Sequence, residues 1–286
     1  MLRSAPVPSA YGAALTAALA QPGNILSDAP DLRWARLVGT CCAVAGGTWE
    51  RAVPVAAAVE LFMVALDVLD DEEDGEQSVL RVALGAGRAL NVSTGLLLLA
   101  QQGLLDAADG PTVAALLIHA GLEACGGQDA DLAPPSDRCG SLDDALAVTA
   151  SKAAPLVAVA CRLGAVCAGA NPEVQELYAR FGGYAGMVAQ LANDLAAIRP
   201  EAAGKTDIAL GRPTLPLTHA SLLTRAMGTG NDGRGAATHT APWAHGPVQL
   251  TWAVAEMYRR RALDLIPQLA SDHAGRTALA EMLSVL

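Results

Sequence analysis

Aromatic side chains are scarce in this sequence: Phe, Trp and Tyr make up 3% of its 286 residues. The hydrophobic 52% is therefore mostly Ala, Leu and Val, and these residues recur at helical spacing between polar ones. No segment alternates apolar and polar residues well enough to predict a strand. The sequence thus predicts an all-α fold in which helices pack on helices.

Internal repeats and a convincing linker are also missing, so residues 1–286 are predicted to form a single domain with one large core. The long segment 228–247 shows no periodicity, and both a mobile lid and a plain surface loop are open readings. A second loop is predicted over residues 128–141. Apolar spacing predicts helices near 8–20, 31–46, 51–74, 78–106, 111–126, 141–169, 172–198, 214–227, 247–265 and 272–285.

Basic residues are too few to favour a nucleic-acid partner, since 19 of them face 29 acids and the net charge is −10. No basic stripe exists that would neutralise phosphates along a strand. The apolar runs are interrupted before the roughly 20 residues that span a bilayer, and the N-terminus lacks the apolar core of a signal peptide. We therefore expect a soluble, cytoplasmic protein without a membrane span.

The six cysteines include no CxxC pair and no Cys/His cluster with zinc spacing. They are predicted to be reduced residues of the core.

Acidic residues, in contrast, are concentrated at one place. Six acids fall within residues 67–74, directly after an apolar helix. At 100° per residue, Asp67, Asp70, Asp71 and Asp74 share one helix face. Like charges so close together repel unless a cation intervenes, and acids at a helix C-terminus oppose the helix dipole. Carboxylates are the ligands that Mg²⁺ prefers, so a metal site is predicted, against the alternative of a solvated helix end.

Two further features point to the same chemistry. A later helix carries Gln190, Asn193 and Asp194, and Glu201 would share a stripe with Asn193 if that helix continued past Pro200. Only two of the 19 basic residues are lysines, Lys152 and Lys205. A lysine kept among arginines suggests a compact ammonium that grips a phosphate.

The order of these segments resembles the trans-isoprenyl diphosphate synthase superfamily, which includes the polyprenyl synthetases and class I terpene synthases. Glu60 followed by DDEED resembles the first Asp-rich motif. GQDADL (127–132) resembles the GQxxDL motif, and SKAAPL (151–156) resembles the KTxxL motif. QLANDLAA (190–197) stands in the place of the second Asp-rich motif, and GKTDIALGRPTLP (204–216) resembles the GK...DxxxGKxTLP run.

The resemblance implies a helical bundle around a deep cavity that binds a prenyl diphosphate, with about three Mg²⁺ ions at its mouth. It implies catalytic roles for Asp70, Asp74, Lys152 and Asn193. The implied metal ligands are Asp70, Asp71, Asp74, Asn193 and Glu201. The implied diphosphate-binding residues are Lys152, Gln190, Lys205 and Arg259, although a solvated basic face is an alternative for Arg259. The implied cavity wall is Phe62, Ala65 and Leu66. Large aromatics at the positions of Ala65 and Leu66 shorten the product of related enzymes, so this cavity could accept a long prenyl chain. A homodimer through helices near 80–125 is also implied.

The sequence departs from the elongating members of this superfamily at its basic motifs. The early GGKRxR motif is absent, and GEQSVLR replaces the arginine pair expected after the Asp-rich motif. The second motif has Asn193 in place of its first Asp and is closer to the NDxxSxxxE motif of terpene synthases.

These departures favour a Mg²⁺-dependent, terpene-synthase-like enzyme that ionises one prenyl diphosphate, although the few aromatics count against a cyclase. Three alternatives remain: a polyprenyl diphosphate synthase such as a geranylgeranyl diphosphate synthase, a non-catalytic partner subunit of one, and a prenyltransferase that uses another acceptor.

Overall fold

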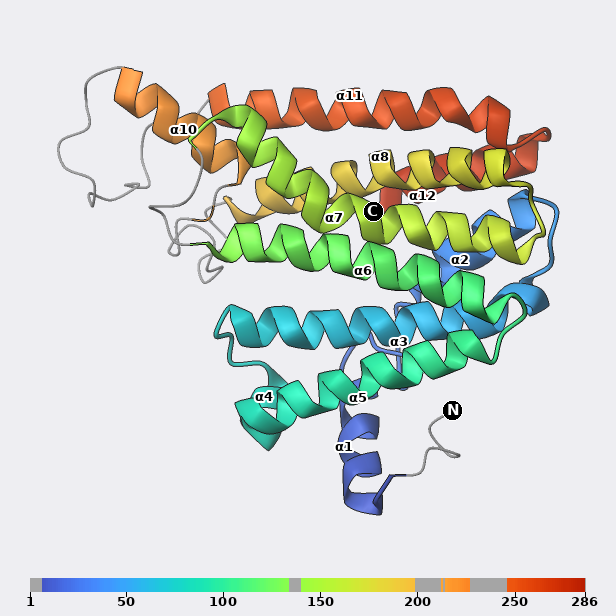
Figure 1. Ribbon diagram of the computed structural model, residues 1–286. Helices are drawn as coiled ribbons and strands as arrows, with labels where there is room; N and C mark the ends of the chain where they lie inside the picture. The colour runs from blue at the N-terminus through green and yellow to red at the C-terminus, as the bar shows by residue number, and fades with distance from the viewer. Residues whose placement is uncertain (1–6, 134–139, 199–211, 213, 227–245, 286) are drawn as a thin grey trace. The chain divides into compact units, whose positions relative to one another are not determined.

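The computed structural model describes residues 7–133, 140–198, 212, 214–226 and 246–285 (Figure 1). All regular elements in these ranges are helices, which confirms the predicted all-α class. In chain order they are α1 (Ser9–Leu19), α2 (Arg33–Val44), α3 (Trp49–Glu73), α4 (Val79–Leu84), α5 (Ala86–Leu105), α6 (Gly110–Leu132), α7 (Leu142–Cys167), α8 (Pro172–Ala197), α10 (Leu215–Ala226), α11 (Gly246–Leu269) and α12 (His273–Val285).

Two predicted boundaries are wrong, both at glycines. The helix predicted over 78–106 is two helices, because Gly85 has a φ of 79° and turns the chain between α4 and α5. The helix predicted to end at residue 126 continues through Leu132, so the loop predicted from residue 128 begins later. Gly127 lies inside this longer helix, where it allows close packing against the backbone of Lys152.

The described residues fall into two compact units. Unit 1 comprises residues 1–117 and 160–175, and unit 2 comprises residues 118–159 and 176–286. Helices α6, α7 and α8 each contribute to both units. A single domain over the whole chain stays a prediction.

In unit 1, α3 packs against both α5 and α2 (Figure 1). Every residue of α3 from Ala58 to Ala65 is buried, as expected for a helix that is apolar on all sides. The hydroxyl of Ser93 on α5 donates a 2.8 Å hydrogen bond to the carbonyl oxygen of Ala65. This contact fixes α5 against the part of α3 that precedes the acidic residues.

The start of α2 depends on a residue of α3. Leu32, the residue before α2, has no side chain that caps the helix, and the carboxylate of Glu60 accepts a 2.7 Å hydrogen bond from the backbone N–H of Ala35 instead. Glu60 is 4% exposed. Burial raises the pKa of Glu60, and the Ala35 N–H partly offsets this by stabilising the charged form.

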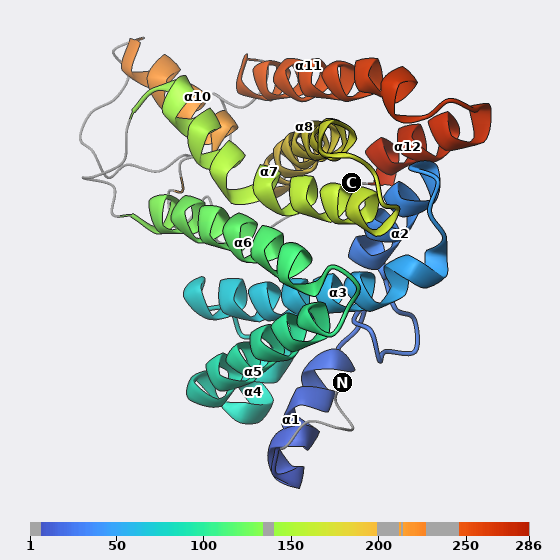
Figure 2. The ribbon, with the colours of Figure 1, turned by 45° about the vertical axis from the view of Figure 1, so that its right-hand side comes forward.

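In unit 2, apolar residues from four helices form one core cluster. Its buried members are Ala145, Met187, Leu191, Leu215 and Ala255. Helix α7 is bent along its length (Figure 2). It contains Pro155, which has no backbone N–H to donate within the helix.

Two helices, α3 and α7, are long and apolar enough to cross a membrane, although no such run was expected from the sequence. The apolar window of α3 is 67% buried inside the protein and that of α7 is 33% buried. Length and composition alone are weak evidence for a span, because core helices share both properties.

Candidate functional site

The acidic residues of unit 1 occupy the C-terminal turns of α3. The helix runs through Glu73, and the N–H of Asp74 still bonds to the carbonyl oxygen of Asp70 at 2.9 Å, before Gly75 ends it with a φ of 68°. The predicted helical spacing of Asp67, Asp70, Asp71 and Asp74 is therefore confirmed.

Burial and mutual repulsion raise the pKa values of two carboxyl groups on this face. Desolvation, followed by repulsion from Asp70 and Asp71, raises the pKa of Asp67 to about 6. The Asp67 side chain also reaches solvent, so a cation could approach it. Desolvation also raises the pKa of Asp71, with repulsion from Glu76 as the next cause. A bound cation would relieve both effects.

The described residues contain no group of three acidic, His or Cys side chains that converges on one point as a ready ligand set for a metal. The donors at the end of α3 are instead a row of carboxylates. Such a row suits Mg²⁺, which usually keeps several waters and bridges one or two carboxylates to substrate phosphates. The residues present thus fit Mg²⁺ held jointly with a phosphate.

An arginine that the sequence reasoning missed lies beside this row. Arg81 on α4 forms an ion pair with Glu72, whose side chain is 4% exposed. The hydroxyl of Ser78 caps α4 by accepting a 3.2 Å hydrogen bond from the N–H of Arg81. A serine is a common first residue of a helix, so Ser78 could have predicted from the sequence that a helix starts there and carries Arg81 in its first turn.

The predicted cavity residues are enclosed by unit 1. Phe62 is 6% exposed and Ala65 is 0% exposed. Leu66 is half-buried, one residue closer to the acidic row. Because Ala65 is fully buried, a larger side chain at this position would have to displace neighbouring atoms of unit 1.

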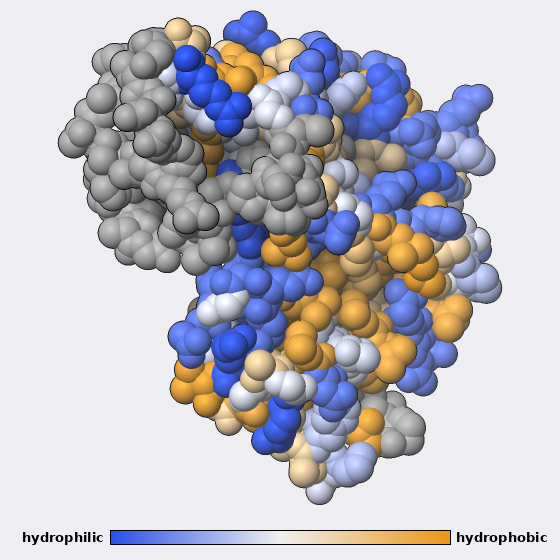
Figure 3. All heavy atoms as spheres, turned by 60° about the vertical axis from the view of Figure 1, so that its left-hand side comes forward, coloured by the Kyte–Doolittle hydropathy of each residue, from blue (hydrophilic) through white to orange (hydrophobic). Residues whose placement is uncertain are grey.

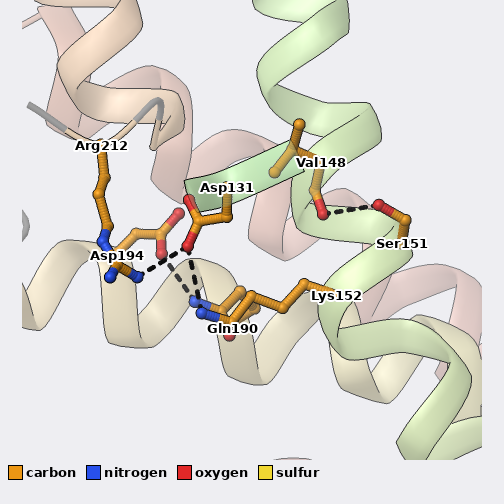
Figure 4. Close-up of polar contacts among 7 residues, drawn as sticks. All are labelled: Asp131, Val148, Ser151, Lys152, Gln190, Asp194 and Arg212. Carbon is orange, nitrogen blue, oxygen red and sulfur yellow. Dashed lines mark hydrogen bonds and ion pairs between the residues drawn. The ribbon is translucent and has the colours of Figure 1, made fainter. Parts of the chain in front are cut away.

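Unit 2 holds a cluster of charged residues around Asp131 (Figure 4). One oxygen of Asp131, Oδ2, lies 3.2 Å from the ammonium of Lys152 and 2.9 Å from Nη1 of Arg212. The side chains of Asp131 and Arg212 are 10% and 4% exposed, whereas that of Lys152 is 26% exposed. Two cations thus share one carboxylate, and only Lys152 has a substantial solvent-exposed part.

Two glycines bring the helices of this cluster together. A Cβ at Gly127 on α6 would lie 2.4 Å from the backbone N of Lys152, and one at Gly186 on α8 would lie 3.0 Å from the carbonyl oxygen of Ala153. Both α6 and α8 therefore approach the backbone of α7 beside Lys152. The continuation of α6 past Gly127 carries Asp131 to the lysine.

Helix α8 adds a second polar pair. The amide of Gln190 donates a 3.0 Å hydrogen bond to Oδ1 of Asp194, which is buried, while Asn193 is exposed on the same helix. Asp194 was noted in the sequence but not selected as a site residue. Glu201 and Lys205 lie outside the described residues.

Arg259 on α11 makes a different contact. It donates two hydrogen bonds to the carboxylate of Glu256, at 2.6 and 3.1 Å, and Arg260 donates a third. These bonds lower the pKa of Glu256 to about 2. The side chain of Arg259 is 45% exposed, so in this structure it belongs to a surface ion-pair group. Its role toward a diphosphate stays a prediction.

The described helices thus carry two groups of charged residues, the row of carboxylates at the end of α3 and the buried cluster of Lys152, Asp131 and Arg212. The polyprenyl synthetase family model matches residues 24–228. This range includes both groups of residues. The chain therefore belongs to the polyprenyl synthetase family.

Curated relatives agree with this assignment. A protein of Mycobacterium tuberculosis named (2E,6E)-farnesyl diphosphate synthase is 35% identical over 195 residues, which are 64% of this chain and 54% of the relative. A geranylgeranyl diphosphate synthase of the same species is 29% identical over 86% of this chain and 71% of its own length. The chain thus spans little more than half of the first of these relatives.

Solved structures share the fold. A polyprenyl synthetase from Streptomyces coelicolor A3(2) superposes with a TM-score of 0.78 at 21% identity, covering 99% of this chain and 94% of the other. A geranylgeranyl pyrophosphate synthetase from the archaeon Geoglobus acetivorans gives a TM-score of 0.80 at 20% identity, with coverages of 99% and 91%.

Proposed function

We propose that this chain is a prenyl diphosphate synthase, which transfers the prenyl group of an allylic diphosphate to isopentenyl diphosphate and releases pyrophosphate. The family match over residues 24–228 carries the proposal, and the names of the mycobacterial relatives supply the substrate class. This is the second of the functions considered from the sequence; the comparisons favour it over the terpene-synthase-like reading.

The reaction breaks the allylic C–O bond, and pyrophosphate leaves with the electron pair. The double bond of isopentenyl diphosphate then attacks the allylic carbon, and loss of a proton forms the new double bond. Mg²⁺ held by Asp70, Asp71 and Asp74, and on the other motif by Asn193 and Glu201, would neutralise charge on the leaving group. The buried wall at Phe62 and Ala65 would keep water from the carbocation.

Lys152 is the residue of unit 2 best suited to bind the diphosphate. Its ammonium is partly exposed, and Asp131 holds it at one end, with Arg212 on the other side of the same oxygen. Lys152 is therefore the cation of this cluster that a diphosphate in solvent could reach. Gln190 is the neighbouring amide donor, and Lys205 is proposed as a second ammonium.

The terpene-synthase-like alternative still has specific support. The early basic motif is absent from the sequence, and Asn193 stands where elongating enzymes have an Asp. Arg81 replaces part of the missing basic charge, because its ion pair with Glu72 places one arginine beside the acidic row.

The test is a set of reactions with Mg²⁺ and geranyl, farnesyl or geranylgeranyl diphosphate, each with and without isopentenyl diphosphate, followed by pyrophosphate measurement and mass analysis of the products. We expect release only when isopentenyl diphosphate is present, together with longer diphosphates. Release without it, with a hydrocarbon or alcohol as product, would establish the terpene-synthase-like reading. No release in any reaction would favour a partner subunit or an untested acceptor.

The Mg²⁺ requirement should depend on pH. A proton on Asp67 removes negative charge beside the proposed ligands Asp70 and Asp71, so it weakens the attraction of this face for Mg²⁺. Because the pKa of Asp67 is raised to about 6, half-saturating Mg²⁺ should rise several-fold as the pH falls below 6. Mg²⁺ titrations of activity at pH 5.5 and 8 check this, and Asp67→Asn should flatten the difference. An equal Mg²⁺ requirement at both pH values contradicts it.

We further propose a homodimer formed through α4, α5 and α6. Apolar side chains lie at the protein surface among polar ones (Figure 3). On α5, Leu98 is 66% exposed and Leu105 is 58% exposed, and on α4, Val82 is 71% exposed. These side chains lie on two helices that contact each other, and exposed apolar residues that gather in one patch mark a contact surface.

Leu98→Arg is expected to convert the dimer to a monomer, because it would bury an unpaired charge in the interface. Light scattering after gel filtration measures the mass. Trp252→Arg on α11 is the matched control, since Trp252 is 62% exposed and lies outside these helices. A wild-type monomer, or a dimer that Leu98→Arg leaves intact, would remove the proposal.

A further inference from the structure

Unit 1 contains a group of cysteines that the proposed chemistry does not use. Cys41 and Cys42 lie on α2, and Cys161 and Cys167 lie near the end of α7. Cys41, Cys42 and Cys161 are 0% exposed. Cys125, on α6, is exposed, which corrects the prediction that every cysteine belongs to the core.

The backbones of α2 and α7 touch at this group. Gly164 lies so close to α2 that a Cβ built on it would be 2.6 Å from the Cβ of Cys41 and 2.4 Å from the carbonyl oxygen of Val38. Cys161 is one helical turn before Gly164 and therefore shares its face. The neighbouring Cys161 thiol contributes, after burial, to the raised pKa of Cys41.

We propose that Cys41 and Cys161 are a modification site at which a small peroxide forms a disulfide between α2 and α7. The sulfur of one cysteine attacks the peroxide and becomes a sulfenic acid as water leaves. The second sulfur then displaces water from the sulfenic acid. In total the two thiols lose two hydrogens and two electrons, and hydrogen peroxide is reduced to two waters.

The thiol of Cys42, the residue next to Cys41, is arranged differently. The thiol of Cys42 points to the backbone and donates a 3.4 Å hydrogen bond to the carbonyl oxygen of Thr48. Cys42 is thus a matched control, one residue from Cys41 and equally buried.

Burial sets the rate of the reaction. It raises the pKa of the Cys41 thiol well above its ordinary value, and the thiolate is the reactive form. The pair should therefore react slowly and only with a small oxidant, after the exposed Cys125 has reacted. The disulfide closes a long loop, so the oxidised protein should melt about 5 °C higher than the reduced one.

The experiment treats the folded full chain with hydrogen peroxide, at a dose raised until Cys125 is fully oxidised. Free thiols are then blocked, and tryptic peptides are identified by mass. Trypsin separates the cysteines usefully, because Cys41 falls in peptide 37–51, Cys161 in 153–162 and Cys167 in 163–180. We expect peptide 37–51 joined to 153–162, in a form that dithiothreitol reverses.

Two variants identify the bond. Peptide 37–51 also contains Cys42, so Cys42→Ser should keep the cross-link and Cys41→Ala should lose it; Cys41→Ser serves if the alanine variant fails to fold. A link from 37–51 to 163–180, a link that is lost in Cys42→Ser or survives in Cys41→Ala, or no link after Cys125 has reacted would each overturn the proposal. None of these outcomes depends on the reaction that the enzyme catalyses.

Discussion

Asp70→Ala and Asp74→Ala should each reduce pyrophosphate release by about 10³-fold or more, because each removes a carboxylate from the row that is proposed to hold Mg²⁺. The residues are one turn apart at the end of α3, where the N–H of Asp74 bonds to the carbonyl oxygen of Asp70. Neither side chain belongs to the apolar core, so the helix content measured by circular dichroism should not change.

Glu76→Ala is the matched control for this prediction. It removes the same charge two residues beyond Asp74, from an exposed position outside the helix. If repulsion or net charge alone controlled the activity, Glu76→Ala would resemble the aspartate variants. Near-normal turnover of Asp70→Ala at saturating Mg²⁺ would exclude the metal role.

Asp131→Asn should lower both stability and substrate affinity. It removes one acidic partner of Arg212, whose side chain is 4% exposed, and breaking a buried ion pair in this way costs up to about 3–5 kcal/mol. The melting temperature should therefore fall by about 10 °C. The KM for the allylic diphosphate should rise as well, because Lys152 loses the carboxylate 3.2 Å from its ammonium.

Two further variants separate these effects. Asp129→Asn changes an exposed acid on the same helix and should leave both quantities unchanged. The double variant Asp131→Leu with Arg212→Met removes both buried charges, so it should recover most of the lost stability but not the KM. If the double variant recovered both the melting temperature and the KM, Asp131 would have only a structural role.

The acidic row was predictable from the sequence because it depends on local spacing alone. Once residues 67–74 are helical, Asp70 and Asp74 must lie on one face. The buried wall before it followed from the apolar run through Ala65. The break at Gly85 was also within reach, since a glycine in a helical pattern is a known signal for a turn.

The cluster around Asp131 was not predictable in the same way. Asp131 and Arg212 are 81 residues apart, and their ion pair depends on how α6 packs. The sequence reasoning also ended the helix at Gly126, which would have placed Asp131 in a loop. A glycine that ends a helix and one that permits close packing look alike in sequence, and only the packed structure distinguishes them.

The hydrogen bond from the Ala35 N–H to Glu60 has a consequence for the order of folding. Helix α2 has no side-chain cap of its own, so its first turn cannot be stable before α3 docks beside it. Native-state hydrogen exchange would record this dependence at a single amide. The Ala35 amide should exchange only through openings that also separate α3 from α2, and Glu60→Ala should accelerate its exchange while leaving amides inside α3 protected.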